Sequence, residues 1–287
     1  MYMTNDPQSA AASVESASER EATLEAWLRA RGRVAVGYSG GVDSAYLAVL
    51  ARRTLGPDGV IAIIGRSASY PAEQWATARR VADDFGLPVL ELDTDELSDP
   101  RYAANPANRC YFCKNELWGR LVPAAWARGF GTVVDGTNAD DLSDHRPGAQ
   151  AAREHAVASP LADVGFTKPE IRERSRLLGL PTWQQPSSPC LSSRLPYGTG
   201  VTAARLQQVE RAERAIRELG LTGDLRVRYH DELARIELPH EQLADWLAPE
   251  RSAALQAAVA GAGFTRVALD LRGFRSGSLN VLHGVVA

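Results

Sequence analysis

The sequence predicts an α/β protein with a doubly wound parallel sheet, followed by a smaller α+β domain. Two observations predict this class. Short apolar segments alternate with helical segments between residues 33 and 134, which is the pattern of parallel strands joined by helices. Beyond about residue 200, a long helical segment is followed by two segments of alternating hydrophobicity, which is typical of paired strands. The domain boundary is therefore expected at residues 199–200.

In the first domain, each expected strand is a short apolar run and each expected helix has apolar residues at helical spacing. Pro71 suits the first turn of a helix, where no backbone donor is needed. The expected elements are a helix at 22–31, a strand at 33–38, a helix at 44–54, a strand at 60–64, a helix at 71–85, a strand at 88–92, a helix at 114–128, a strand at 132–134 and a helix at 169–178.

The second domain, residues 200–287, is expected to begin with an amphipathic helix at 202–219, whose apolar face carries Leu206, Val209, Ile216 and Leu219. Its other expected elements are strands at 225–229 and 234–238, helices at 241–247 and 253–262, and a strand at 266–271. Residues 1–20 are rich in Ala, Ser and Glu and are expected to form a disordered tail. The first domain then spans residues 21–199.

The 287 residues are 45% hydrophobic and 23% charged, the composition of an ordinary globular protein, and their net charge of −3 argues against general nucleic-acid binding. Only Lys114 and Lys168 among the 32 basic residues are lysines, so anion sites are expected to use arginines or backbone amides. No apolar stretch is long enough to span a membrane, and residues 1–20 do not resemble a secretory signal. We expect a cytoplasmic protein that binds neither nucleic acid nor membrane.

The sharpest motif is Ser39-Gly-Gly-Val-Asp-Ser44, which lies between an expected strand and an expected helix. Its glycines allow close approach of the backbone, and the amides at a helix N-terminus favour an anion. Asp43 suits such a site when it holds a cation such as Mg²⁺. The GxxxxGK[ST] pattern and a neighbouring lysine are absent, which excludes a Walker-type site. A glycine-rich turn without a ligand is the alternative.

This motif resembles the signature of the PP-loop ATP pyrophosphatase superfamily. The resemblance implies an enzyme that binds ATP and Mg²⁺, adenylylates an oxygen of its substrate and releases pyrophosphate. The implied ligands of pyrophosphate and Mg²⁺ are Ser39, Gly40, Gly41, Asp43 and Ser44. A later strand end resembles the superfamily's second nucleotide-side loop, although by itself it is equally a polar turn. The residues implied there are Gly136, Thr137 and Asn138.

The three cysteines are too few for a secreted disulfide scaffold. Cys110 and Cys113 form a CxxC pair ahead of an expected helix, and Cys190 lies in a loop rich in Pro and Ser. The residues alone leave three interpretations open: incidental thiols, a redox pair or metal ligands. Zinc and iron–sulfur sites usually take four protein ligands. Three thiolates on a 4Fe-4S cluster would leave one iron open to a reacting ligand.

Longer motifs at 144–148, 190–198, 225–230, 234–239 and 269–277 are similar to the LarE family. That family carries out ATP-dependent sulfur insertion in the synthesis of the nickel-pincer nucleotide cofactor of lactate racemase, and the resemblance covers roughly residues 20–280. It implies pyridinium-3,5-biscarboxylic acid mononucleotide as the substrate. ATP would adenylylate a carboxylate, and sulfur would then displace AMP.

Two sulfur sources occur in such enzymes. One subtype sacrifices the sulfur of a single cysteine just before the Ser-Ser-Arg run, and in this chain that position is Pro189. The other subtype has three cysteines and uses a 4Fe-4S cluster with one open iron. The resemblance therefore implies that Cys110, Cys113 and Cys190 are catalytic cluster ligands. The protein that reloads the sulfide is unknown.

Arg194, Arg226 and Arg228 are candidate ligands of the substrate phosphate or carboxylates, because guanidinium forks suit both. Arg226 and Arg228 are two residues apart on an expected strand and so point to one face, with a solvated basic face as the alternative. Trp75 is a candidate wall for the pyridinium ring, and a core position is the alternative.

Glu237 and Asp270 are expected to form ordinary ion pairs with arginines. A PP-loop tRNA thiolase and a non-catalytic nucleotide-binding protein remain alternative functions. Residues 201–287 carry eleven basic and eleven acidic side chains, a balance that argues against RNA as substrate. LarE-family members tend to be homo-oligomers, so a homo-oligomer is expected.

Overall fold

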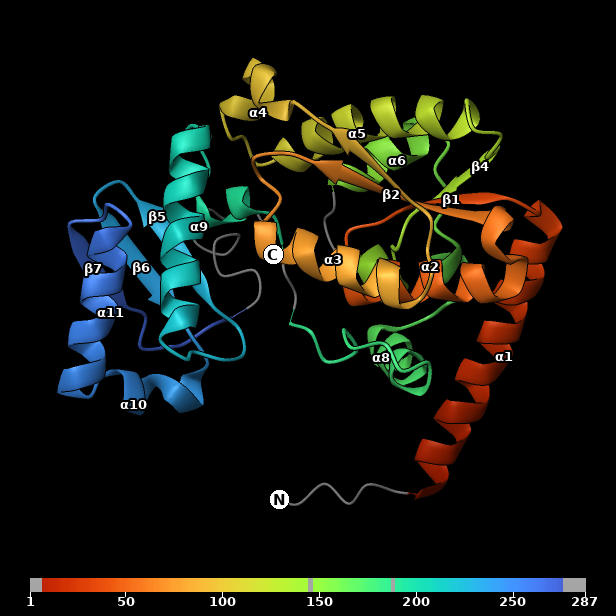
Figure 1. Cartoon of the computed structure of the whole chain (residues 1–287). Helices are drawn as coiled ribbons and strands as arrows, with labels where there is room; N and C mark the ends of the chain where they lie inside the picture. The colour runs from red at the N-terminus through yellow and green to blue at the C-terminus, as the bar shows by residue number, and fades with distance from the viewer. Residues whose placement is uncertain (1–6, 144–146, 187–188, 276–287) are drawn as a thin grey trace. The chain divides into compact units, whose positions relative to one another are not determined.

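The structure is a computed structural model that describes residues 7–143, 147–186 and 189–275 (Figure 1). The chain divides into two compact units, each treated separately below. The first unit consists of Met1–Arg66, Ala72–Thr94 and Cys113–Gln185, and the second of Ser67–Pro71, Asp95–Phe112 and Pro186–Ala287.

The second unit is therefore larger than the expected domain 200–287. It takes in the loop before residue 200 because that loop is bonded to the two earlier segments. Leu191 N donates to Ser69 O over 2.8 Å, and Val201 N donates to Ala103 O over 2.8 Å. Such long-range backbone bonds leave no signal in the local sequence pattern.

The first unit contains a four-stranded parallel sheet with the order β3-β2-β1-β4. The strands are β1 (Val34–Gly37), β2 (Val60–Arg66), β3 (Val89–Asp93) and β4 (Thr132–Val134). Val34 pairs with Val60 on one side and with Thr132 on the other, so β1 lies inside the sheet. Its residues Val34, Ala35 and Val36 are fully buried, which explains the apolar run.

Helices cover both faces of this sheet, so the predicted doubly wound fold is confirmed. Figure 1 shows α2 (Val42–Leu55) and α3 (Ala72–Asp84) on one face and α5 (Arg109–Trp126) and α6 (Pro147–Glu154) on the other. Helix α2 also packs against α1 (Pro7–Arg31) and α8 (Lys168–Leu177), and its residues 44–51 are all buried. The short helix α7 spans Pro160–Asp163.

The N-terminus differs from the sequence prediction. Helix α1 begins at Pro7, so residues 7–20, which were expected to be a disordered tail, are helical. Alanine-rich segments favour the helix intrinsically. Tertiary contacts add to this, since Ala17 is buried and Arg20 forms an ion pair with Glu170 of α8. Residues 1–6 lie outside the described residues.

The second unit contains a three-stranded sheet of order β5-β6-β7, against which α9 (Ala203–Glu218) and α11 (Pro249–Gly261) pack. Strands β5 and β6 pair antiparallel, whereas β6 and β7 pair parallel, which confirms the α+β character. Leu206, Val209 and Ile216 are fully buried, as their spacing predicts, whereas Leu219 is exposed because the helix ends at Glu218. The elements are α4 (Pro100–Ala103), α9 (Ala203–Glu218), β5 (Arg226–His230), β6 (Leu233–Glu237), α10 (Leu243–Trp246), α11 (Pro249–Gly261) and β7 (Arg266–Leu269).

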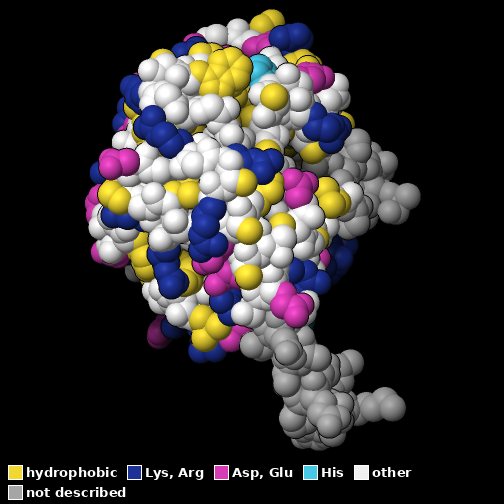
Figure 2. All heavy atoms as spheres, turned by 90° about the vertical axis from the view of Figure 1, so that its right-hand side faces the viewer, with side chains coloured by type: hydrophobic (Ala, Val, Ile, Leu, Met, Phe, Trp, Pro, Cys, Tyr) yellow, Lys and Arg dark blue, Asp and Glu magenta, His cyan; other side chains and the backbone are white. Residues whose placement is uncertain are grey.

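Two observations concern the surface. Within the described part of the chain, no helix combines the length and the apolar character needed to cross a membrane. On the face that Figure 2 shows, basic and acidic side chains are interspersed, and neither sign gathers into a continuous patch. This mixing matches the small net charge of the sequence.

Candidate functional site

The Ser39–Ser44 loop connects β1 to α2, as the sequence predicts. Gly40 has a φ of +69°, a left-handed conformation that glycine adopts readily. A Cβ atom on Gly40 would lie 2.5 Å from the Cβ of Ala78, so the loop packs directly on α3. Both the backbone conformation and this close approach require glycine at position 40.

The interior of the loop is polar. Ser39 Oγ and Ser44 Oγ are 3.2 Å apart, and Ser39 N donates to Ser44 Oγ over 3.2 Å. Gly41 is the N-cap residue of α2 and offers no side-chain acceptor to the first helical amides. A helix start without a side-chain cap is complementary to a bound anion.

The Asp135–Asn138 loop follows β4, which is the neighbour of β1 in the sheet. A Cβ atom on Gly136 would lie 2.8 Å from Ser44 N, so the two loops are in contact. Thr137 Oγ1 donates to Asp135 Oδ2 over 2.9 Å, which fixes the turn. The two loops that the sequence identified therefore meet at the carboxyl ends of adjacent strands, where open α/β sheets bind ligands.

Asn138 has a structural role in this loop. It is buried, and its Oδ1 accepts hydrogen bonds from Asp140 N over 3.0 Å and from Asp141 N over 3.2 Å. The Asp140 carboxylate in turn accepts from Lys168 N over 2.7 Å. Asn138 thus shapes the turn that leads to the start of α8.

Lys168 is a site residue that sequence reasoning missed. Its Nζ forms an ion pair of 2.5 Å with Asp43 Oδ2, so the expectation that no lysine lies near this loop is wrong in three dimensions. The other oxygen, Asp43 Oδ1, is buried and has no hydrogen-bond partner among the described residues. A carboxylate oxygen left in this state is suited to a cation. The sequence signal that could have pointed to Lys168 is the rarity of lysine, because it is one of only two lysines among 32 basic residues.

The CxxC pair lies in the first turn of α5, because this helix begins at Arg109 rather than at residue 114. A turn in which Arg109 N donates to Pro106 O over 2.9 Å leads into it. Cys110 and Cys113 are three residues apart and so share one side of the helix. Cys110 is exposed, Cys113 is half-buried, and neither they nor Cys190 form a disulfide.

Cys190 precedes the short 3₁₀ helix Leu191–Arg194 in the second unit. Ser193 Oγ donates to Cys190 O over 2.8 Å. Burial of the Arg109 guanidinium acts to lower its pKa, but the charges of Cys190 and Cys110 outweigh this and raise it. Both thiols therefore lie within electrostatic reach of Arg109. Among the residues described, no three His, Cys, Asp or Glu side chains are grouped to hold a metal ion.

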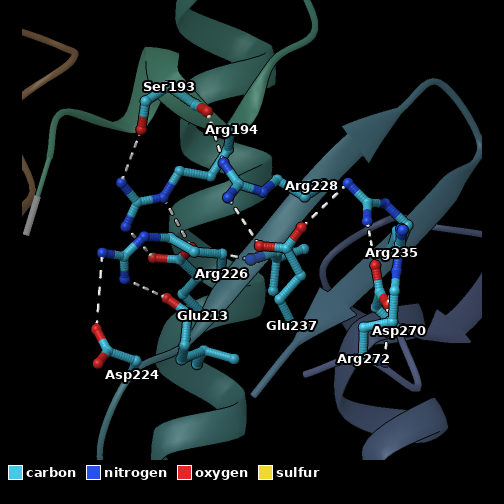
Figure 3. A network of polar contacts seen from close by, with 12 residues as sticks. Ser193, Arg194, Glu213, Asp224, Arg226, Arg228, Arg235, Glu237, Asp270 and Arg272 are labelled. Atoms are coloured by element: carbon cyan, nitrogen blue, oxygen red, sulfur yellow. Dashed lines mark hydrogen bonds and ion pairs between the residues drawn. The ribbon is translucent and has the colours of Figure 1, made fainter. Parts of the chain in front are cut away.

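The candidate arginines lie in the polar network of Figure 3. Arg194 is 2% exposed and forms a bidentate ion pair with Glu213, in which Nε donates over 2.9 Å and Nη2 over 3.0 Å. Arg228 Nη2 donates to Glu237 Oε2 over 2.7 Å. Glu237 and Asp270 both pair with Arg235, so their expected structural role is confirmed.

Arg226 has a different environment. It is 4% exposed, its Nη2 lies 3.9 Å from Asp224 Oδ1, and its Cζ lies over the Phe274 ring, 4.8 Å from the ring centre. Burial and the nearby charge of Arg194 lower the pKa of Arg226 to about 10. The alternative of a solvated basic face is therefore wrong. A buried guanidinium crowded by positive charge is the member of the network best suited to an additional anion.

Trp75 lies on α3 and is half-buried, with no hydrogen-bond partner for its Nε1 in the described chain. The preceding residue, Gln74, donates from Nε2 to Ser39 O over 2.9 Å. Trp75 therefore belongs to the helix that supports the Ser39–Ser44 loop. The pyridinium-wall role of Trp75 stays a prediction.

A family model described as NAD synthase matches residues 18–116, which include the Ser39–Ser44 loop. A protein of Lactiplantibacillus plantarum named pyridinium-3,5-bisthiocarboxylic acid mononucleotide synthase is 37% identical over 261 residues, 91% of this chain and 94% of that protein. An uncharacterised protein of Synechocystis sp. is 46% identical over 248 residues, 86% of this chain and 92% of its own.

The matches to these two proteins extend over most of the chain, whereas the NAD synthase match is confined to residues 18–116. The family model, the parallel sheet and the two contacting loops agree on a PP-loop nucleotide fold. The chain belongs to the LarE family of PP-loop, ATP-using enzymes, that of the pyridinium-3,5-bisthiocarboxylic acid mononucleotide synthase.

Proposed function

We propose that this protein inserts sulfur into pyridinium-3,5-biscarboxylic acid mononucleotide at the expense of ATP, in the synthesis of the nickel-pincer nucleotide cofactor. The observation that carries the proposal is the 37% identity to the synthase, which extends over 91% of the chain. The contact between the Ser39–Ser44 loop and Gly136 supports it, because it provides one continuous anion-binding surface on the first unit.

The proposed reaction has two steps for each carboxylate. A carboxylate oxygen of the substrate attacks the α-phosphorus of ATP, the bond to the bridging oxygen breaks, and pyrophosphate leaves. A sulfur nucleophile at the oxidation level of sulfide then attacks the carbonyl carbon, and AMP leaves with the bonding electron pair. Activation is needed because a free carboxylate is a poor electrophile and a poor source of a leaving group.

In this proposal the amides at the start of α2 and the hydroxyls of Ser39 and Ser44 bind the pyrophosphate portion of ATP. Asp43 holds Mg²⁺ through the oxygen that has no partner, Oδ1. Lys168 then releases Asp43 and neutralises phosphate charge instead. Gly136 and Thr137 border the same surface, while Asn138 keeps their loop in shape.

The second unit binds the anionic groups of the substrate in this proposal. Arg226 is the primary contact, because burial and the positive charge of Arg194 lower its pKa, so that an added anion would stabilise its charged form. Arg194 and Arg228 are committed to Glu213 and Glu237, so they act mainly by raising the positive potential around Arg226. Trp75 remains a candidate for the pyridinium ring.

We propose a 4Fe-4S cluster held by Cys110, Cys113 and Cys190 as the sulfur carrier. The chemical type of the ligands suits such a cluster, because all three are thiols and none is in a disulfide. Two of these thiols also lie within electrostatic reach of one buried guanidinium. When bound, such a cluster supplies an open iron position for the sulfur that is transferred. The chain's own contribution is to place its thiols in the first turn of α5 and at the start of the 3₁₀ helix.

The test is an anaerobic reaction with Mg²⁺-ATP, the biscarboxylic mononucleotide and sulfide, followed by pyrophosphate assay and mass spectrometry of the nucleotide. We expect pyrophosphate release that depends on the mononucleotide, and a product in which sulfur replaces carboxylate oxygen. Release that depends on tRNA instead would establish a tRNA thiolase and overturn the proposal. Turnover-independent ATP binding without pyrophosphate would establish a binding protein.

The sulfur source is tested separately by iron and sulfide analysis of the anaerobic protein. We expect iron and labile sulfide in a ratio close to one, and their loss when any of the three cysteines is replaced by alanine. If the protein is iron-free and Cys190 becomes dehydroalanine during turnover, the cluster proposal is overturned. The sulfur-insertion proposal then stands, with Cys190 as the sacrificed sulfur source.

A further inference from the structure

Arg109 forms a buried connection between two segments of the second unit. It is 4% exposed, immediately precedes Cys110, and its Nη1 donates to Ser192 O over 2.9 Å and to Asn105 Oδ1. Ser192 lies two residues after Cys190. One guanidinium therefore joins the segment that leads into α5 to the loop that carries Cys190.

Asn105 strengthens the same connection. Its Nδ2 donates to Pro196 O over 2.7 Å and to Thr199 O over 2.8 Å, and its own carbonyl accepts from Gly198 N over 2.9 Å. Asn105 has a φ of +57°, an uncommon conformation for a residue other than glycine. So many bonds at one strained residue show that the position of the Cys190 loop is strongly specified.

One part of the Arg109 guanidinium remains unused by these contacts. Its Nε is buried and has no hydrogen-bond partner among the described residues. The guanidinium lies 5.8 Å from the centre of the Tyr197 ring, and the thiols of Cys110 and Cys190 both act on it electrostatically. A buried donor without a partner is costly unless a ligand uses it.

We propose that Arg109 is a positioning residue of the sulfur site: it fastens the Cys190 loop to the start of α5 and presents its Nε–H to the sulfur held there. The inference rests on the proposed function for the identity of that sulfur. It does not depend on whether the sulfur belongs to a cluster or to a cysteine.

The charge of Arg109 suits this role. Three thiolates around a 4Fe-4S cluster give a group with net negative charge, and hydrogen bonds to sulfur together with nearby positive charge make such a group easier to reduce. The same guanidinium would attract an anionic sulfur group on Cys190 alone. Lysine in place of Arg109 would keep the charge but could not donate to Ser192, Asn105 and sulfur from one planar group.

The variants Arg109→Met and Arg109→Lys test the inference, with Arg101→Met as the matched control. Arg101 lies in the same segment, but it is exposed and pairs with Asp99. After anaerobic reconstitution, we expect the midpoint potential of the cluster to move to a more negative value in R109M. A partial return is expected in R109K, and no change in R101M.

A second readout works without iron. At a pH where the Cys190 thiol is fully ionised, a nearby cation attracts an anionic alkylating reagent more than a neutral one. We expect the ratio of iodoacetate to iodoacetamide alkylation rates at Cys190, measured by mass spectrometry, to fall about fivefold or more in R109M and to remain unchanged in R101M. R109K should retain most of the wild-type ratio, and it serves as the folded comparison if R109M is unstable.

The outcomes separate the two proposals. Wild-type protein that binds no iron overturns the cluster, and the alkylation ratio then decides on Arg109 alone. An R109M protein with the wild-type alkylation ratio overturns the inference whether or not a cluster forms. A wild-type potential in iron-loaded R109M also overturns it, because Arg109 would then only support the fold.

Discussion

The two units use buried charge in opposite ways. In the first unit, Asp43 pairs with Lys168 but keeps one buried oxygen that has no hydrogen-bond partner among the described residues, and the start of α2 has no side-chain cap. In the second unit, the buried guanidiniums of Arg194 and Arg228 form short hydrogen bonds to Glu213, which is half-buried, and to Glu237, which is buried. Polar groups of the first unit are thus available to ligands, whereas those of the second unit also stabilise the fold. Mutations should therefore separate activity from stability in one unit and affect both in the other.

The largest effect is expected from Glu213→Gln in the second unit. This change leaves the buried guanidinium of Arg194 without its carboxylate and weakens the bond to Val227 N. Breaking a buried ion pair in this way costs about 3–5 kcal/mol of unfolding free energy, which urea denaturation measures. Glu218→Gln on the exposed side of the same helix is the control. A loss below about 1 kcal/mol would show that the network is not needed for stability.

Asp43→Asn should produce the opposite pattern in the first unit. We expect pyrophosphate release to fall by about 10²–10³-fold, the scale of removing one electrostatic contributor to catalysis, while the urea midpoint stays close to wild type. The measurement is single-turnover pyrophosphate release at saturating Mg²⁺-ATP. Asp58→Asn, at an exposed position of the same unit, controls for the loss of a negative charge. Equal activity of the two variants would remove Asp43 from the site.

Lys168→Met should have a smaller effect, and one confined to nucleotide binding. We expect the KM for ATP to rise about tenfold, equivalent to ~1.4 kcal/mol, because the ammonium no longer neutralises phosphate charge. The control is Arg128→Met, which removes an exposed positive charge from the same unit. An unchanged KM with a reduced kcat would assign Lys168 to the chemical step instead.

The smallest effect concerns pH and His230 on β5. Burial and the charges of Arg235 and Arg228 lower the pKa of His230 below its ordinary value of 6.5. As the pH falls below about 6.5, the unfolded chain binds this proton first, so stability decreases with falling pH until the folded pKa is reached. Thermal unfolding from pH 7.5 to 5.5 should show a weaker decrease in His230→Asn than in wild type. His240→Asn, at an exposed position, should keep the wild-type slope.

The features that the sequence predicted correctly depend on residues that are close together in the chain. The run from β1 through Gly40 into α2 follows from adjacent residues, and the i, i+2 spacing of Arg226 and Arg228 correctly places both on one face. Their burial is compensated by carboxylates from other elements, because the charge of Glu213 acts on Arg226 and Glu237 pairs with Arg228. No local pattern carries that information.

Three features escaped prediction for related reasons. Lys168 reaches Asp43 across 125 residues of sequence, so only the fold reveals the pair. Helix α5 begins at Arg109 because the preceding turn is fixed by long-range bonds of Asn105. Helix α1 extends back to Pro7, where an Ala- and Ser-rich composition concealed a helix that gains tertiary contacts at Ala17 and Arg20.

The ion pair between Lys168 and Asp43 links the binding of metal to the binding of nucleotide. In the proposed site, a divalent cation on Asp43 Oδ1 repels the ammonium of Lys168 from the same carboxylate, so that Lys168 then needs another anion. A triphosphate that attracts Lys168 must likewise leave Asp43 in need of another cation. Each ligand therefore removes the obstacle to the other, and thermodynamic reciprocity makes their coupling equal in both directions. The site would bind Mg²⁺ and ATP cooperatively and either one weakly alone, which protects the protein from occupation by a metal ion or a bare nucleotide.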